Sequence, residues 1–317
     1  MPIYQRGSTG PEVKRIQERL RELSHYRGPL DGVFDGGVES AVKSFQRAEE
    51  ILVDGIVGPQ TWSHLFDGED VPAPAIVDEP LAHRSLALTG SFETGAPPPE
   101  CFAGLSGDFD GQGISFGCLQ WNLGQGSLQP LLQEMGRRHP EVMEDVFGEY
   151  YPELQSVLEA PQREQLAWAR SIQDTNRDEL HEPWRGLFKT LGRREACQDV
   201  QVEAADALYD DAVDLAQEYA VDSERAVTLM FDIKVQNGSI PGAVEAQILR
   251  DFDQLPDDHG EEARLRIIAN RRAEASNPRW IEDVRTRKLT IATGRGTVHG
   301  RRYDLSEEYG IRLKEAI

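Results

Sequence analysis

Apolar residues recur at spacings of three and four along most of the chain, which is the period of an amphipathic helix. The first seventy residues contain two such segments, whose apolar faces are Val13, Ile16, Leu20 and Leu23, then Val38, Ala41, Val42 and Phe45. Pro59 suits the first position of a third, short helix, which would turn Trp62 and Leu65 inward. The pattern predicts an N-terminal three-helix bundle.

Two similar turns separate these predicted helices. They contain Asp31-Gly32-Val33 and Asp54-Gly55-Ile56. Asp-Gly suits a tight turn because the Asp side chain caps the backbone and Gly accepts a positive φ. From the sequence alone, Asp31, Asp54 and Trp62 are either ligand contacts or purely structural residues.

These features in combination resemble the small peptidoglycan-binding domain that accompanies many wall hydrolases. The segments that carry the resemblance are Gly7–Val13, Gln17 to Leu20, Asp31-Gly32, Ala41 to Gln46 and Asp54–Trp62. The similarity covers nearly all of residues 3–66, and it departs from the family at Asp35-Gly36-Gly37, where a glycine and often a proline usually follow. The resemblance implies a shallow groove for wall peptide or glycan.

Residues 67–84 contain several prolines and acids with weak periodicity, which is typical of an extended linker. Helical patterns then continue almost to the C-terminus, and strand and turn character is confined to about residues 104–121. We therefore expect a mainly α protein in which an α+β, lysozyme-like domain with one small β-hairpin region follows the bundle. The predicted domains are 1–67, a linker at 68–84, and 85–317.

Two carboxylates lie at the edges of this hairpin region. Glu93 follows Phe92 at an expected apolar helix end, where burial would keep a carboxyl protonated near neutral pH. Asp110 lies between polar residues and the glycines Gly111 and Gly113, where solvent would keep it ionised. Two carboxyls in such different environments are the minimum equipment for cutting a glycosidic bond.

The spacing of these acids resembles the lysozyme superfamily of glycoside hydrolases, most closely its chitosanase-like branch. Glu93 is followed, after sixteen residues, by Asp110-Gly111-x-Gly113-x-Ser115. The resemblance implies that Glu93 is the general acid, that Asp110 is the general base, and that the hydroxyl of Ser115 holds the attacking water. Ser115 replaces the usual threonine, which keeps the oxygen and loses a methyl group. Carboxyls more than about 6 Å apart would make the enzyme inverting.

Each acid also has a simpler explanation. Glu93 could be a solvated acid at a helix terminus, Asp110 a turn former, and Asp108 is a rival for the second catalytic acid. Gln120, Trp121 and Asn122 could line sugar subsites by hydrogen bonding and stacking. Alternatively, Trp121 belongs to the core and only Asn122 is solvated.

A second predicted set of substrate contacts lies far along the chain. Phe231–Gly238 resembles the helix end that closes the cleft in the same superfamily, which makes Gln236 and Asn237 substrate-contact candidates. A helix C-cap at Asn237-Gly238 would explain both residues without a ligand. The segment from Arg271 to Arg302 is locally basic, either as a solvated face or as a rim that meets wall carboxylates.

Composition narrows the function further. The formal net charge is −21 and the pI is about 4.8, which argues against a nucleic-acid-binding protein and favours attraction of a cationic polymer. No apolar run is long enough for a membrane span, and residues 1–6 lack the apolar core of a signal peptide. The histidine and cysteine spacings predict no metal site, and we expect no cofactor. Cys101 and Cys118 either form a disulfide or remain thiols.

The sequence therefore predicts a cell-wall glycoside hydrolase of the muramidase type, acting on peptidoglycan or a related amino-sugar polymer. A chitosanase, a lytic transglycosylase and a non-catalytic wall-binding protein are the alternatives. Synthesis in the cytoplasm without an export signal suits a phage endolysin released at lysis, or an antibacterial effector with its own delivery machinery and a cognate inhibitor.

Overall fold

A computed structural model describes residues 3–72, 74–174 and 178–316. Residue 73, in the predicted linker, lies outside the described residues. The chain divides into two compact units, of which the first comprises Met1–Ser85, Ala96–Pro98 and Leu208–Ile317, and the second Leu86–Gly95 and Pro99–Ala207. The predicted boundaries at 67 and 84 are not tested by this division and stay a prediction.

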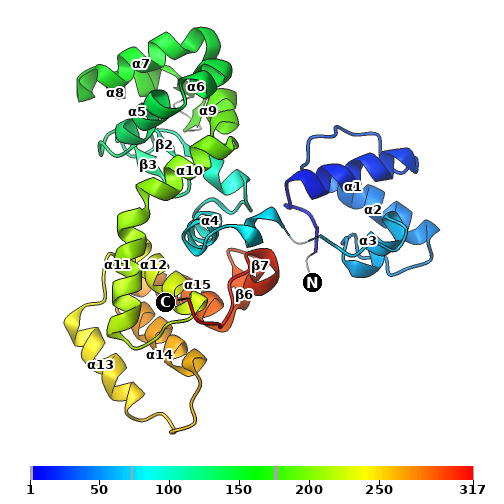
Figure 1. The fold of residues 1–317 in the computed structure, drawn as a ribbon. Helices are drawn as coiled ribbons and strands as arrows, with labels where there is room; N and C mark the ends of the chain where they lie inside the picture. The colour runs from blue at the N-terminus through cyan, green and yellow to red at the C-terminus, as the bar shows by residue number, and fades with distance from the viewer. Residues whose placement is uncertain (1–2, 73, 175–177, 317) are drawn as a thin grey trace. The chain divides into compact units, whose positions relative to one another are not determined.

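The N-terminal residues form the expected three-helix bundle, drawn in blue in Figure 1. Its helices are α1 (Pro11–Glu22), α2 (Gly36–Ala48) and α3 (Pro59–Leu65). Every predicted inward residue is buried except Leu23, which is 37% exposed. Leu23 lies outside because α1 ends at Glu22 and Leu23 is already its C-cap.

The same hydrogen-bonding arrangement holds both Asp-Gly turns of this bundle. Gln17 Nε2 donates to Asp31 Oδ1 over 2.8 Å, and its Oε1 accepts from the N–H of Gly32. Gln46 Nε2 donates to Asp54 Oδ1 over the same 2.8 Å, and its Oε1 accepts from the next glycine N–H. A buried glutamine thus replaces the missing backbone partners of each turn. Asp31 and Asp54 therefore have a structural role in these turns.

Trp62 is also structural. Its side chain is fully buried, with ring centroids 5.7 Å from Tyr4 and 4.3 Å from Phe66. Aromatic rings at these separations contribute to a core through tilted packing as well as through the area they bury. This side chain cannot meet a wall ligand without opening the bundle.

The remainder of the first unit is mostly helical, and α4 and α11 pass from one unit to the other. Helix α4 begins within the predicted linker. The elements are η1 (Ala75–Asp78), α4 (Leu81–Thr94), α11 (Asp206–Glu218), α12 (Glu224–Asn237), α13 (Gly242–Phe252), α14 (Glu261–Glu274), η4 (Pro278–Trp280), α15 (Ile281–Thr293), β6 (Arg295–Val298), β7 (Arg301–Asp304) and α16 (Leu305–Glu308).

Helices α12 and α15 enclose a buried ionic cluster. Asp232 accepts hydrogen bonds from Arg287 Nη2 over 2.7 Å and from Lys288 Nζ over 2.6 Å, and all three side chains are almost fully buried. Burial alone would raise the pKa of Asp232, but the two adjacent cations lower it to about 2. Because Arg287 and Lys288 are held inside the fold, they do not form the solvated rim considered for the basic C-terminal segment.

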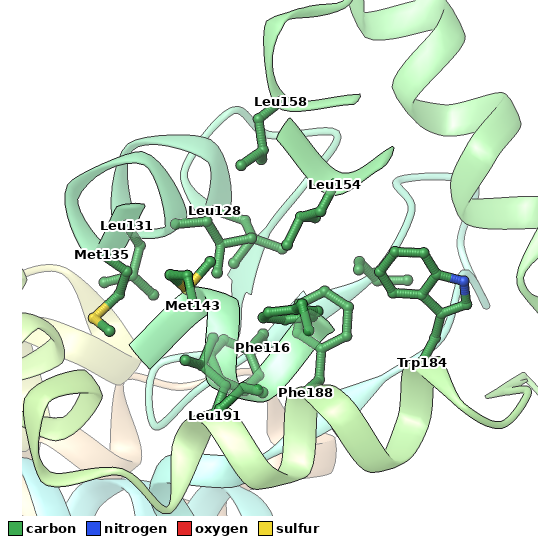
Figure 2. Packing of buried hydrophobic residues seen from close by; sticks show 14 of the residues in the cluster. Phe116, Leu128, Leu131, Met135, Met143, Leu154, Leu158, Trp184, Phe188 and Leu191 are labelled. Carbon is green, nitrogen blue, oxygen red and sulfur yellow. The ribbon is translucent and has the colours of Figure 1, made fainter. Parts of the chain in front are cut away.

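The second unit gathers helices around a small antiparallel sheet (Figure 1). Figure 2 shows Phe116 of this sheet beside Phe188, with the ring centroids 5.5 Å apart. The elements are η2 (Glu100–Ala103), β1 (Leu105–Ser106), β2 (Ser115–Phe116), β3 (Trp121–Asn122), α5 (Leu128–Arg138), α6 (Pro140–Phe147), η3 (Gly148–Tyr150), α7 (Tyr151–Glu159), α8 (Gln162–Ser171), β4 (Gln173–Asp174), β5 (Glu179–Leu180), α9 (Trp184–Gly192) and α10 (Glu195–Ala204).

The mainly α class is confirmed, but the strand content differs from the expectation of one hairpin region. That region forms a three-stranded sheet in the order β1-β2-β3, and two further hairpins, β4-β5 and β6-β7, were not predicted. The β6-β7 turn contains His299 and Gly300, both with positive φ (49° and 81°), as a tight two-residue hairpin requires. Val298-His299-Gly300 was the available sequence signal, within a segment that was interpreted only through its charge.

Candidate active site

Glu93 lies at the end of a buried helix. The residues from Leu86 to Phe92 are all buried, and Glu93, the penultimate residue of α4, is where the helix becomes exposed. The helix end is as predicted, but Glu93 is exposed rather than buried as expected. Burial of Phe92 does not extend to its neighbour, because successive helical residues point about 100° apart.

Two glycines bring the end of α4 against the sheet. A Cβ added at Gly90 would lie 2.9 Å from Cys118 Cβ, in the turn between β2 and β3. A Cβ added at Gly104, directly before β1, would lie 2.6 Å from Thr94 Cγ2. Contacts this close leave no room for a side chain, so helix and sheet approach through glycine at both places. Glu93 therefore stands on a helix end that is packed directly on the hairpin region.

Asp110 lies in the loop between β1 and β2. It is exposed, and its Oδ1 accepts a 3.0 Å hydrogen bond from the N–H of Gln112, which makes it an Asx turn. Gly111 and Gly113 both have positive φ (84° and 77°), so the turn requires glycine at these positions. The residue is exposed, as the sequence predicted, and its role as the general base stays a prediction.

Asp108 has a different environment from Asp110. Its side chain is 2% exposed, and its Oδ1 accepts from the N–H of Gly113 over 2.9 Å while Oδ2 accepts from Arg170 Nε over 3.1 Å. The backbone N–H of Asp108 also donates to Gln173 Oε1 over 2.7 Å. These bonds make Asp108 the anchor of the loop, and they leave Asp110 as the carboxylate that is open to solvent.

Ser115 and Asn122 face each other across strands β2 and β3. Ser115 is buried, and its Oγ accepts a 3.0 Å hydrogen bond from Asn122 Nδ2. Asn122 Oδ1 in turn accepts from the N–H of Gln125 over 2.9 Å. The Ser115 hydroxyl therefore keeps its hydrogen for donation, and Asn122 sets its orientation.

The predicted subsite residues around Trp121 have mixed environments. Gln120 is half-buried, with its Oε1 accepting from Ser106 Oγ over 2.6 Å and its Nε2 donating to Gly117 O over 2.8 Å. Trp121 is half-buried against the core, and Asn122 is buried, so the alternative in which only Asn122 is solvated does not hold. Their roles as substrate contacts stay predictions.

Gln236 and Asn237 end α12 in the first unit, as predicted from Gly238, which has φ of 76° at the C-cap. Gln236 Oε1 accepts a 2.7 Å hydrogen bond from Lys288 Nζ, so it belongs to the border of the buried ionic cluster. Asn237 is half-buried, and its Oδ1 is a buried atom with no hydrogen-bond partner. Contact of these two residues with substrate stays a prediction.

The three cysteines are buried free thiols, so the disulfide alternative for Cys101 and Cys118 does not hold in this structure. Burial raises the pKa of the Cys118 thiol, and the adjacent Cys101 raises it further. Among the described residues, no group of three or more His, Cys, Asp and Glu side chains could hold a metal ion. No helix of the described chain is long and apolar enough to cross a membrane.

One candidate site residue in the acid-bearing loop was not identified from the sequence. Phe109, between Asp108 and Asp110, is 68% exposed, and it is the large apolar side chain most exposed to solvent in the described part of the second unit. The bonds of Asp108 hold its backbone in place. An aromatic residue flanked by two acids in a glycine-rich turn was the signal that could have identified it, since such a residue has no core to enter.

Comparison with known families matches residues 9–65 to the "Putative peptidoglycan binding domain" family. The spore cortex-lytic enzyme of Bacillus cereus is 39% identical over 63 residues, which cover 20% of this chain and 24% of that enzyme. The N-acetylmuramoyl-L-alanine amidase CwlM of Mycobacterium tuberculosis is 39% identical over 65 residues, covering 20% and 15%. The chain thus matches about a quarter or less of the length of these relatives.

Comparison with solved structures gives alignments that cover more of the chain, at low similarity. A glycoside hydrolase family 46 chitosanase of Gynuella sunshinyii in complex with chitotetraose has 15% identity and a TM-score of 0.43, covering 71% of this chain and 97% of that one. A Burkholderia AP3 phage endolysin has 17% identity and a TM-score of 0.20, covering 74% and 96%. At these values the likeness carries no assignment, which leaves the chemistry to the geometry of the site.

Proposed function

We propose that this protein is a cell-wall glycoside hydrolase of the muramidase type, in which the N-terminal domain binds peptidoglycan and Glu93 and Asp110 cleave its glycan strands. The observation that carries the proposal is the packing of the α4 end on the hairpin region through Gly90 and Gly104. This packing joins the two elements that bear the acids. The family match of residues 9–65 supports the wall as the place of action.

The proposed reaction is a single displacement. Glu93 donates its proton to the leaving glycosidic oxygen while a water molecule attacks the anomeric carbon, and Asp110 takes the proton of that water. Asp110 Oδ1 is held by Gln112 N–H, which leaves Oδ2 for the water. Ser115, oriented by Asn122, holds the same water. A glycan bound over Glu93 would supply the desolvation that the free protein lacks.

A chitosanase is the second candidate, favoured by one observation. The net charge of −21 attracts a cationic polymer such as chitosan and repels polyanions. We favour peptidoglycan because the matched domain binds that polymer in its family. Action on the wall would follow lysis or specialised delivery, where a cognate inhibitor could protect the producer.

Parallel digestion of purified peptidoglycan and of chitosan tests the choice of substrate. We expect soluble fragments from peptidoglycan and little release from chitosan, measured by mass spectrometry of the supernatants. The full-length protein, including residues 1–67, is used with both polymers. Release from chitosan alone would replace the muramidase with the chitosanase.

Phe109 provides a stacking surface for a sugar ring beside Asp110 in this proposal. We expect Phe109→Ala to raise the KM for glycan roughly fivefold with little change in kcat, because an aromatic contact of about 1 kcal/mol is lost from ground state and transition state alike. Phe109→Tyr should keep the wild-type KM. Since the side chain is 68% exposed, neither variant should change the melting temperature. A wild-type KM in Phe109→Ala would remove this residue from the site.

A further inference from the structure

Helix α9 and its C-cap residue carry three cations along one side. Its buried face is made by Trp184, Phe188 and Leu191, which enter the core shown in Figure 2. Arg185, Lys189 and Arg193 follow at spacings of four, so they lie in one row next to that face. We call these three residues the α9 stripe. Arg185 and Arg193 are exposed and Lys189 is half-buried.

Among the described residues, only one of the three cations of the α9 stripe has a carboxylate partner. Some exposed arginines elsewhere are paired within their own helix, as in Arg137 with Glu134 and Arg266 with Glu262. In the stripe, Arg193 pairs with Glu100, with Nη2 2.9 Å from Oε2. Over the described residues, no carboxylate lies within ion-pair distance of Arg185 or Lys189.

The like charges of this row oppose one another. Cations four residues apart on a helix repel each other. Burial lowers the pKa of the Lys189 ammonium; Glu100 acts to raise it, while Arg193 and Arg185 lower it further. The row is a local group of positive charges in a protein whose net charge is −21. Arg185 and Lys189 are therefore available to an external anion.

The stripe also has a defined place in the second unit. At Gly192, the last residue of α9, an added Cβ would lie 2.5 Å from Ala103 Cα and 2.6 Å from Phe102 O, so α9 ends against η2. Glu100, the partner of Arg193, is the first residue of η2, and Gly104 joins η2 to β1. The stripe thus ends beside the segment that connects the Glu93 helix to the acid-bearing sheet.

We propose that the α9 stripe binds carboxylates of the peptide stems that project from the glycan strand. This inference rests on peptidoglycan being the substrate in the proposed function. Arg and Lys bind carboxylates through charge-assisted hydrogen bonds. Chitosan, which presents amines, would be repelled by the same row, so the stripe selects between the two polymers although the overall charge favours the cationic one.

Sedimentation of the full chain with three polymers tests the stripe by binding alone. The polymers are intact sacculi, sacculi whose carboxyl groups have been amidated with carbodiimide and ethanolamine, and glycan freed of its stems by an amidase. We expect the double variant Arg185→Gln/Lys189→Gln to bind intact sacculi roughly fivefold to tenfold more weakly than wild type. It should match wild type on the other two polymers. Arg163→Gln, an exposed arginine of α8, is the matched control and should behave as wild type.

Salt provides the second readout. Wild-type binding to intact sacculi should weaken as NaCl rises, and the double variant should show a shallower dependence, because exposed charges are screened by salt. Equal binding of the double variant and wild type to intact sacculi would overturn the proposal, as would an equal loss on stem-free glycan. None of these binding measurements requires catalytic turnover. A protein that binds sacculi through the stripe but does not cleave them would therefore contradict the proposed hydrolase function and still support the proposed role of the stripe.

Discussion

Replacement of Glu93 by glutamine should lower the turnover of purified sacculi by about 10³-fold, while sedimentation with the same sacculi stays unchanged. The expected loss follows from removing the proton that the leaving oxygen needs, and general acid catalysis contributes about 10²- to 10⁴-fold. Gln keeps the size and the exposed position of the side chain at the end of α4, so the fold should be unaffected. Dye release from labelled sacculi measures the rate.

Two comparisons make the Glu93 result specific. Glu164→Gln changes an exposed glutamate of α8 in the same unit and should keep full activity. Asp110→Asn should reduce hydrolysis almost as far as Glu93→Gln if a water molecule must be activated, whereas a lytic transglycosylase would tolerate this change. Wild-type turnover by Glu93→Gln would end the assignment of the acid to this helix.

Asp232→Asn should lower the free energy of unfolding by about 3–5 kcal/mol, the largest stability effect we expect in this chain. Asp232 is the common partner of Arg287 and Lys288, and its amide replacement leaves two buried cations without a counter-charge. Urea unfolding followed by circular dichroism measures the loss. Asp211→Asn is the matched control, because Asp211 pairs with Lys234 of the same helix α12 at an exposed site. A surface pair of this kind contributes about 1 kcal/mol or less.

The same cluster predicts a dependence on acid. The pKa of Asp232 is lowered from the ordinary 3.8 to about 2 in the folded chain. A depressed carboxyl pKa gives stability that is fully present above the unfolded value and is lost as the pH falls through the folded one. Wild-type protein should therefore lose this contribution between about pH 4 and pH 2, and Asp232→Asn should lack that part of the profile. Equal stability of variant and wild type at pH 7 would show that the cluster does not hold α12 to α15.

The N-terminal bundle was predicted almost completely, because its helices and turns are each specified by short-range sequence patterns that are consistent with one another. Helical spacing identified the buried faces, and the Asp-Gly pairs marked both turns. What the sequence left open was the role of Asp31 and Asp54. Their partners Gln17 and Gln46 lie 14 and 8 residues earlier in the chain, on the preceding helices, and only the fold shows that these glutamines hold the turns.

The site was predicted less completely, for a different reason. The helix end at Glu93 and the turn at Asp110 follow from local signals, whereas the exposure of the Glu93 carboxyl depends on the contacts around α4. The order of burial at Trp121 and Asn122 could not follow from periodicity, since strands of two residues have no period. Phe109 was overlooked because an apolar residue is expected to enter a core, and only the anchored loop of Asp108 shows that it does not.

The most direct test of the hydrolase proposal is the chemistry of the new chain ends. Purified peptidoglycan digested by the wild-type chain in water enriched in ¹⁸O should yield fragments that each carry one ¹⁸O atom at a new reducing sugar end, as read by mass spectrometry. Fragments with anhydro ends that lack ¹⁸O, or free stem amino groups without new reducing ends, would contradict glycoside hydrolysis by Glu93 and Asp110.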